Sequence, residues 1–349
     1  MTRPNIILIL GIVIFGFFND VENRIGIGGS EQEWGFVEVR PGAHMFWWLF
    51  YVTGSINSTF YEKPLLIWLE GGPGLSSTGT GNFDKIGPLD GKQNHRNHSW
   101  VKDYNVLFID SPVGAGFSYV KNKTLLCKTD AEVVEDLLTF MNHFYKNIPK
   151  FRDVPVYLLG ESYGGKIVVN FASGWYKNQR SSTNLGNLKG IAVGGAWISP
   201  IDSMSAWAPY LLQIGLIDSS GSRRIDEKVN QIIEAIKTKK WNAIDELVAS
   251  ALEIIWSETR GVDFYNVLEK VSSKSLISGK LIDFDSPDTE KEAMFAKFII
   301  ALTTTNSLMN GIVRKSLGIN QTWTGLSQDV HVALGHDFAK PATRCGKAT

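Results

Sequence analysis

Short apolar runs that alternate with helical patterns constrain the fold of this chain more than any other feature. Three runs have the length of buried strands, at residues 64–69, 105–110 and 155–160, and a further strand is expected at 188–193. A helix is expected from Thr129, where Thr129-Asp-Ala-Glu132 reads as a capping box, and another is expected after Ser162. Continuously apolar strands separated by helices are typical of parallel sheets. The sequence therefore predicts an α/β protein with a mostly parallel central sheet and helices on both faces.

Two regions flank this pattern. Residues 34–51 alternate, turn at Pro41-Gly42 and continue as an aromatic-rich run, which predicts a β-hairpin. From about Ser222 the apolar spacing becomes that of long helices, and we expect a helical lid insertion at about 220–320. Extra core helices packed on the sheet fit the same spacing, so both interpretations stay open.

The size and charge of the chain narrow the class of partner. At 349 residues, with 44% hydrophobic and 20% charged residues, the chain can bury the core of one large domain. Thirty-five basic residues balance 35 acidic ones, so neither nucleic acid nor an anionic membrane surface is indicated. We expect a small molecule or a peptide as the partner.

The N-terminus and the sequons point to the secretory pathway. Residues 6–18 are nearly all apolar and lead into a polar segment, which predicts a signal peptide over 1–20 and a mature domain over 21–349. An uncleaved anchor or a buried helix is the alternative. Acceptor sites for N-linked sugar occur at Asn57, Asn97, Asn122 and Asn320. The expected product is a secreted or lysosomal glycoprotein with no membrane span after cleavage.

The two cysteines, Cys127 and Cys345, allow at most one disulfide, and whether they pair stays open. They have neither CxxC nor Cys/His spacing, so no metal site and no thiol catalysis is expected.

A candidate nucleophile lies between the third strand and the helix that follows it. Gly160-Glu-Ser-Tyr-Gly164 is a G-x-S-x-G motif, and this context predicts a nucleophile elbow that exposes Ser162 above the sheet. The glycine-rich segment 70–77 follows the first strand, where backbone N–H groups can stabilise an oxyanion. A serine in an ordinary glycine-rich turn, and a tight surface turn, are the alternatives for the two segments.

Longer motifs extend the pattern along the chain. They are Trp68-Leu-Glu-Gly-Gly-Pro-Gly74, Gly87-Pro-Leu89, Asp110-Ser-Pro-Val-Gly-Ala-Gly-Phe-Ser-Tyr119, Gly160-Glu-Ser-Tyr-Gly-Gly-Lys166, Trp197-Ile-Ser-Pro-Ile-Asp202 and Leu308-Met-Asn310. In this order they resemble the serine carboxypeptidases, an α/β-hydrolase family, and most closely its retinoid-inducible branch. The resemblance covers roughly residues 34–341.

The resemblance implies roles for five residues. Ser162 resembles the nucleophile that attacks the last peptide carbonyl, and the backbone N–H groups of Gly72 and Tyr163 resemble the oxyanion hole. Glu161 and the position held by Glu70 resemble the groups that bind the C-terminal carboxylate of the substrate. The implied substrate is a peptide with a free C-terminus, and the mechanism needs no cofactor.

Position 70 departs from the family pattern, which usually has an amide there. An ionised Glu70 cannot donate a hydrogen bond to a substrate carboxylate, and clustered carboxylates have to share protons. We therefore expect any activity to be confined to acidic pH. Leu75 also replaces a cysteine that is common in relatives, so their disulfide at this turn is absent.

The family Asp and His that would complete a Ser-Asp-His triad are not found in this sequence, which has no YNGxLD-like or GHM-like segment. Only His331 and His336 follow Ser162, and a rearranged triad could use one of them. Possible acidic partners are Asp283, Asp285, Asp329 and Asp337. Three hypotheses follow: a shortened form of an active carboxypeptidase, a secreted peptide-binding pseudoenzyme, and a hydrolase of unusual arrangement. Transfer of the acyl group to an alcohol instead of water is a further alternative.

Overall fold

The computed structural model describes residues 24–53, 59–180, 185–270, 274–277, 280–283, 302 and 304–342. The expected signal peptide, Asn57, Cys345, Asp285 and much of the expected insertion after residue 270 lie outside the described residues.

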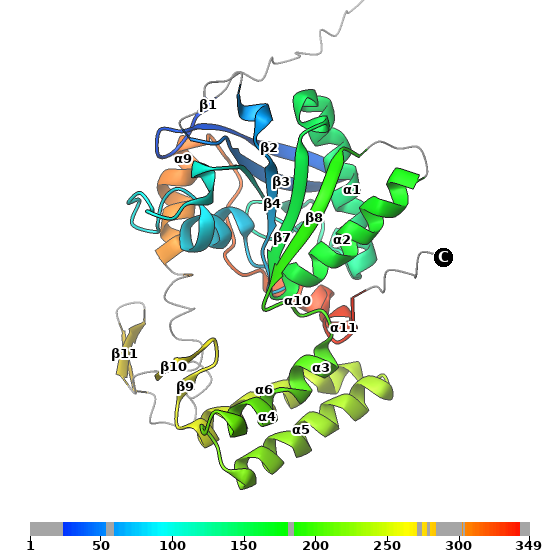
Figure 1. Ribbon diagram of the computed structural model, residues 1–349, viewed down its shortest axis with the longest axis vertical. Coiled ribbons are helices and arrows are strands. Elements are labelled where there is room, and N and C mark those ends of the chain that lie inside the picture. Colours follow the sequence, from blue (N-terminus) through cyan, green and yellow to red (C-terminus); the bar gives the residue numbers. More distant parts are fainter. Residues whose placement is uncertain are drawn as a thin grey trace, which may run out of the picture.

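One large mixed sheet forms the body of the protein (Figure 1). Its strands run in the order β1-β2-β3-β5-β4-β7-β8, with β6 paired to β3. Their bounds are β1 Arg24–Ile25, β2 Glu31–Arg40, β3 Ala43–Phe50, β4 Leu65–Leu69, β5 Asn105–Ile109, β6 Tyr119–Val120, β7 Pro155–Glu161 and β8 Asn187–Gly194. The hairpin β2–β3 is antiparallel, whereas β5, β4, β7 and β8 pair in parallel. The predicted hairpin and the four predicted parallel strands are confirmed.

The central strands are buried on both faces. Every residue of β4 and β5 is buried, because α1 (Asp130–Asn147) and α2 (Tyr163–Arg180) cover one face of the sheet. The other face packs on the helical segments Ser77–Ile86 and Met309–Val313 through Phe83, Met309 and Trp323. This two-sided burial explains why these strands are apolar throughout instead of alternating.

Helix α1 begins at the predicted cap. The Thr129 hydroxyl accepts a hydrogen bond from the Glu132 N–H at 3.2 Å. The Glu132 carboxylate reaches back to the N–H of Lys128 at 2.6 Å, one residue before the position that the capping box predicts. Both interactions satisfy backbone donors at the exposed helix start and set the helix boundary in the sequence.

The remaining helices form a second core at the carboxyl ends of the parallel strands (Figure 1). We call α3–α6 the helical unit: α3 Pro200–Ser205, α4 Trp207–Gln213, α5 Ser219–Lys237 and α6 Ile244–Thr259. The predicted helices correspond to α5 and α6, and the unit begins earlier than expected, at Pro200. Short strands follow at β9 Val262–Asp263, β10 Asn266–Lys270, β11 Lys274–Ile277 and β12 Lys280–Asp283. The described chain then returns to the body with α9 Arg314–Ser316, α10 Gln328–Ala333 and α11 Gly335–Phe338.

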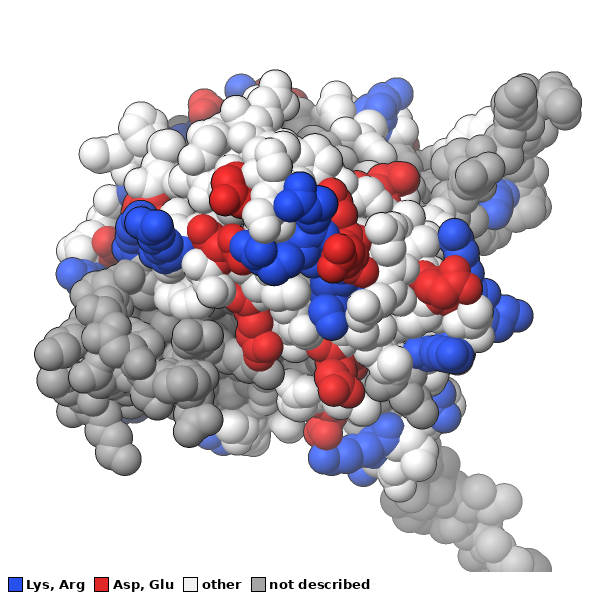
Figure 2. Space-filling model, turned by 90° about the horizontal axis from the view of Figure 1, so that it is seen from below, with Lys and Arg blue, Asp and Glu red and all other residues white. Residues whose placement is uncertain are grey.

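The outer face of the helical unit carries charges of both signs. Figure 2 looks onto this end of the molecule and shows Lys and Arg side chains interspersed with Asp and Glu. An interspersed pattern gives no extended field of one sign on this face, in line with the balanced composition.

A buried ion pair joins the hairpin to α1. Arg40 contacts the fully buried Asp136 through two hydrogen bonds, Nε to Oδ1 at 2.6 Å and Nη2 to Oδ2 at 3.0 Å. The thiol of Cys127, a buried free cysteine, donates to the same carboxylate at 3.2 Å. Burial raises the pKa of this thiol, and the Asp136 charge adds to the rise. Cys127 is therefore a protonated donor to the ion pair.

Removing the cation from this pair is expected to destabilise the protein. Arg40→Met leaves the Asp136 carboxylate buried without its partner, and we expect the free energy of unfolding in urea to fall by about 3 kcal/mol. The double variant Arg40→Met/Asp136→Asn removes the unpaired charge and should recover more than half of the loss. Equal losses in the single and double variants would contradict an electrostatic origin.

Candidate active site

The backbone at Ser162 has the strained geometry of a nucleophile elbow. Ser162 follows β7 directly and has φ of +56°, a conformation that residues other than glycine rarely adopt. Its N–H donates to the Gly194 carbonyl at 3.0 Å, and its carbonyl accepts from the Trp197 N–H at 2.9 Å. These bonds to the segment after β8 hold the turn between β7 and α2. The predicted elbow is therefore present in the geometry of the backbone.

Glycines allow the turn after β4 to approach the elbow at Ser162. A Cβ atom at Gly71 would lie 2.9 Å from the Ser162 Cβ and 2.8 Å from the Glu161 carbonyl oxygen. A Cβ atom at Gly164 would lie 2.2 Å from the Leu69 carbonyl oxygen. Side chains at these positions would collide with backbone, so glycine is required on both sides of the contact. This approach brings the turn after β4 beside Ser162.

A buried aspartate after β5 holds the turn in shape. The Asp110 carboxylate accepts hydrogen bonds from the Ser76 hydroxyl at 2.8 Å, from the Thr78 hydroxyl at 2.7 Å and from the Phe117 N–H at 2.9 Å. The Thr78 N–H adds a fourth at 3.0 Å. Burial raises the pKa of Asp110, and these donors oppose the rise. The turn after β4 is thus tied to β5, independently of the elbow.

A cavity of about 750 Å³ lies beside Ser162, between the body and the helical unit. Gly72, Glu161 and Ser162 border it together, so the structure unites three of the five predicted site residues at one cavity. The helical unit and the segment after it contribute an apolar wall of Trp207, Tyr210, Leu211, Val248, Leu252, Ile255, Val262 and Phe264. The cavity has the size and the mostly apolar lining of a ligand site.

The other two predicted residues lie next to the cavity. Tyr163 is the first residue of α2, and its side chain is fully buried with its hydroxyl 2.5 Å from Asp130 Oδ1. Only its backbone could serve an oxyanion, as the resemblance implies. Glu70 is 1% exposed and accepts from the Trp68 indole N–H at 3.1 Å and from the Gly71 N–H at 3.2 Å.

A lysine that the sequence analysis did not single out joins the two candidate carboxylates. Lys85 Nζ lies 2.7 Å from Glu70 Oε1 and 2.9 Å from Glu161 Oε2. Burial alone would lower the pKa of Lys85, but the two carboxylates outweigh it and raise the pKa. Because the carboxylates share a cation, activity confined to acidic pH no longer follows from their repulsion alone. No sequence motif marks Lys85, which lies fifteen residues beyond Glu70.

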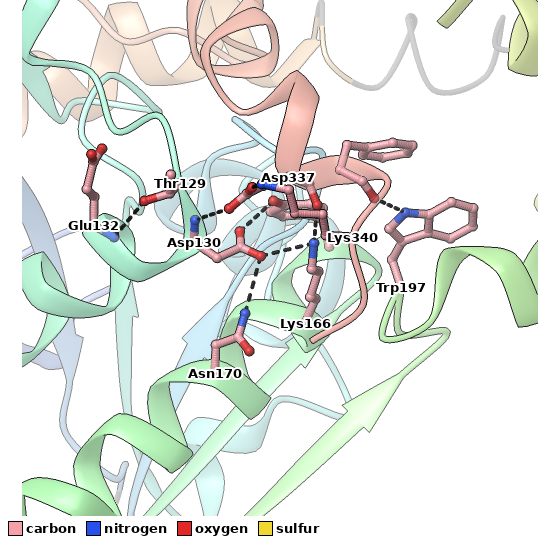
Figure 3. Close-up of polar contacts among 10 residues, drawn as sticks. Thr129, Asp130, Glu132, Lys166, Asn170, Trp197, Asp337 and Lys340 are labelled. Carbon is pink, nitrogen blue, oxygen red and sulfur yellow. Dashed lines mark hydrogen bonds and ion pairs between the residues drawn. The ribbon is translucent and has the colours of Figure 1, made fainter. Parts of the chain in front are cut away.

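A fully buried lysine on the helix after the elbow forms a second charge cluster (Figure 3). Lys166, on α2, has a fully buried side chain with Nζ 3.0 Å from Asp130 Oδ2, and it also donates to the Asp337 carbonyl. The Asp337 carboxylate accepts from the Asp130 N–H at 2.7 Å. Burial lowers the pKa of Lys166, and the Asp130 and Asp337 carboxylates oppose this shift. The cluster fastens α11 to the first turns of α1 and α2.

Neither downstream histidine borders the cavity in the part of the chain that the structure describes. The His331 ring packs near Phe338, and the His336 ring packs near Trp241, each with ring centroids 6.0 Å apart. Asp329 pairs with Lys123, and Asp337 belongs to the charge cluster of Lys166. Among the described residues, therefore, neither histidine of the rearranged triad is placed at the cavity that Ser162 borders.

Comparisons with known proteins agree with this geometry. The serine carboxypeptidase family profile matches residues 26–348. The retinoid-inducible serine carboxypeptidase of Homo sapiens is 37% identical over 317 residues, which are 89% of this chain and 69% of the relative. Serine carboxypeptidase-like 51 of Arabidopsis thaliana is 32% identical, over 91% of this chain and 72% of the relative.

A solved structure supports the fold. Kex1(Δ)p, a prohormone-processing carboxypeptidase from Saccharomyces cerevisiae, superposes with a TM-score of 0.68 at 22% identity, over 90% of this chain and 69% of the other. The fold and site thus define an α/β-hydrolase with a helical insertion, as predicted. This chain belongs to the serine carboxypeptidase family.

None of the helices within the described ranges is both long and apolar enough to cross a membrane.

The buried Lys166 is expected to control how firmly α10 and α11 are held. Lys166→Met removes the donor to Asp130 and to the Asp337 carbonyl, so amide hydrogen exchange over 328–342 should become about 10- to 100-fold faster. Lys340→Met is the matched control, because Lys340 also pairs with Asp337 but its side chain is 48% exposed. Similar acceleration in both variants would contradict a special role for the buried lysine.

Proposed function

We propose that this protein is a serine-type carboxypeptidase that releases C-terminal residues from peptides through an acyl-enzyme on Ser162. The observation that carries the proposal is the strained elbow at Ser162, which opens onto a ligand-sized cavity together with Gly72 and Glu161. Membership in the serine carboxypeptidase family supports peptides as the substrate class.

In the proposed reaction, Ser162 Oγ attacks the carbonyl carbon of the last peptide bond. The C–N bond breaks, the serine hydroxyl proton passes to the leaving nitrogen, the C-terminal residue leaves as a free amine, and the remaining peptide stays on Oγ as an ester. Water then hydrolyses the ester and restores the hydroxyl. The N–H groups of Gly72 and Tyr163 are proposed to bind the oxyanion, since a preorganised donor pair lowers the barrier most where charge develops.

The site beside the nucleophile is proposed to select a free C-terminus. Glu161 borders the cavity, and Lys85 forms ion pairs with both Glu161 and Glu70. An apolar wall on the helical unit would receive side chains of the peptide. The proposed substrate therefore has a free carboxylate and apolar residues near the scissile bond.

The secretory pathway is the proposed location. Asn97, Asn122 and Asn320, three of the four predicted sugar acceptors, are exposed in the structure and could be reached by a glycosyltransferase. The proposed boundaries remain a signal peptide over 1–20 and a carboxypeptidase domain over 21–349.

A peptide-binding protein without turnover is the second candidate. It is favoured by the lining of the cavity, where none of the described residues is a histidine that could take the Ser162 proton. Such a protein would keep the cavity and the carboxylate site but would not form an ester.

Labelling with a serine-directed peptidyl phosphonate separates the two candidates. If Ser162 is activated, the full chain should be labelled and should release the C-terminal residue from a peptide, and Ser162→Ala should lose both activities. The protein used should be glycosylated and should unfold cooperatively. A lack of labelling then reflects the site and not a misfolded chain. Peptide binding without labelling would contradict the carboxypeptidase and support the binding protein.

A further inference from the structure

The ammonium group of Lys85 occupies an unusual place for a lysine, between two carboxylates of very different exposure. The Glu70 side chain is 1% exposed, the Lys85 side chain 25% and the Glu161 side chain 45%. Because Glu161 borders the cavity, Lys85 Nζ is one hydrogen bond away from the cavity wall. Two ion pairs thus link the three residues in series. Glu70 lies in the buried turn after β4, Lys85 pairs with it and with Glu161, and Glu161 borders the cavity.

The number of N–H donors on Lys85 leaves capacity for a ligand. A lysine ammonium has three donors and no acceptor. Two described carboxylates lie within hydrogen-bond distance, Glu70 at 2.7 Å and Glu161 at 2.9 Å. These two contacts leave a third N–H of the ammonium for a further acceptor, and the Lys85 side chain is 25% exposed, so an acceptor can reach it. The Lys85 ammonium also lies 5.9 Å from the centroid of the Trp68 ring, which helps to hold it in place.

The charges of Glu70, Glu161 and Lys85 favour binding of an anion only if the Lys85 ammonium contacts that anion. Two ionised carboxylates alone would repel a carboxylate of the substrate. Lys85 cancels the charge of the buried Glu70, and the charge that remains is on Glu161, where its high exposure allows water to screen it. A carboxylate bound at Lys85 would therefore be attracted by the ammonium at short range, and the screened charge of Glu161 would repel it only weakly.

We propose that Lys85 is the cationic anchor for the C-terminal carboxylate of the substrate, and so a specificity-determining residue of this site. The proposal deepens the proposed function and rests on it for the identity of the ligand. It assigns the attraction of the carboxylate to Lys85, while Glu70 and Glu161 position the ammonium.

Binding to a protein that cannot turn over tests the anchor separately from catalysis. In the Ser162→Ala background, an N-blocked dipeptide with an apolar C-terminal residue should bind about 10- to 100-fold more tightly as its free acid than as its C-terminal amide. Isothermal titration calorimetry with both ligands measures this preference. Weaker binding of the acid than of the amide would overturn the proposal.

The informative variant removes the cation without leaving Glu70 unpaired. Lys85→Met alone strands a buried carboxylate and is expected to destabilise the fold, so Glu70→Leu/Lys85→Met is used instead, because leucine adds no donor that could itself bind the substrate carboxylate. This double variant should bind the acid and the amide equally, and Lys85→Arg should keep most of the preference. If the double variant retains the preference for the acid, Lys85 only neutralises Glu70, and the proposal is wrong.

Two further outcomes are also decisive. Loss of binding for both ligands in the double variant would mean that the three charges only hold the cavity open, which also overturns the anchor. A clear preference for the acid that depends on Lys85, in a protein that shows no turnover with Ser162 intact, would refute the carboxypeptidase activity and leave the anchor standing.

Discussion

The close approach of two backbone segments is the constraint on which the site depends. The turn after β4 and the elbow after β7 touch at Gly71 and Gly164, where even a methyl group would collide with backbone. Parallel pairing of β4 with β7 brings the two turns to the same edge of the sheet, and glycine allows them to meet there. Without this contact, Ser162 and Gly72 would not border one cavity.

Two clusters of paired charges stabilise the surroundings of this contact. Lys85 joins the turn after β4 to Glu161, the residue before Ser162. Lys166 joins α2 to α1 and α11. A buried charge is costly unless it is paired, so each lysine strongly favours the one arrangement of turns and helices in which its partners are present. The strain at Ser162 is supported by these surroundings.

Local patterns in the sequence predicted much of this architecture. The apolar runs became β4, β5, β7 and β8, and Thr129 became the cap of α1, because burial of the central strands β4 and β5 on both faces and helix capping leave short-range signals. Most residues of β8 are exposed, so burial on both faces does not account for its apolar run. The beginning of the helical unit at Pro200 was not predicted, since α3 and α4 are too short to show a clear period. Lys85 and the apolar cavity wall were missed for a different reason: each depends on neighbours that are distant in sequence.

The sequence by itself determined the type of fold, the position of the elbow at Ser162 and the family to which the chain belongs, because motifs and periodicities are properties of neighbouring residues. Only the tertiary structure decided which charges face the site. Glu70 and Glu161 read as a pair of repelling carboxylates along the chain, whereas in the fold Lys85 lies between them. Ion pairing depends on distances of a few ångströms between side chains, and those distances are set by the pairing of strands and not by their order in the sequence.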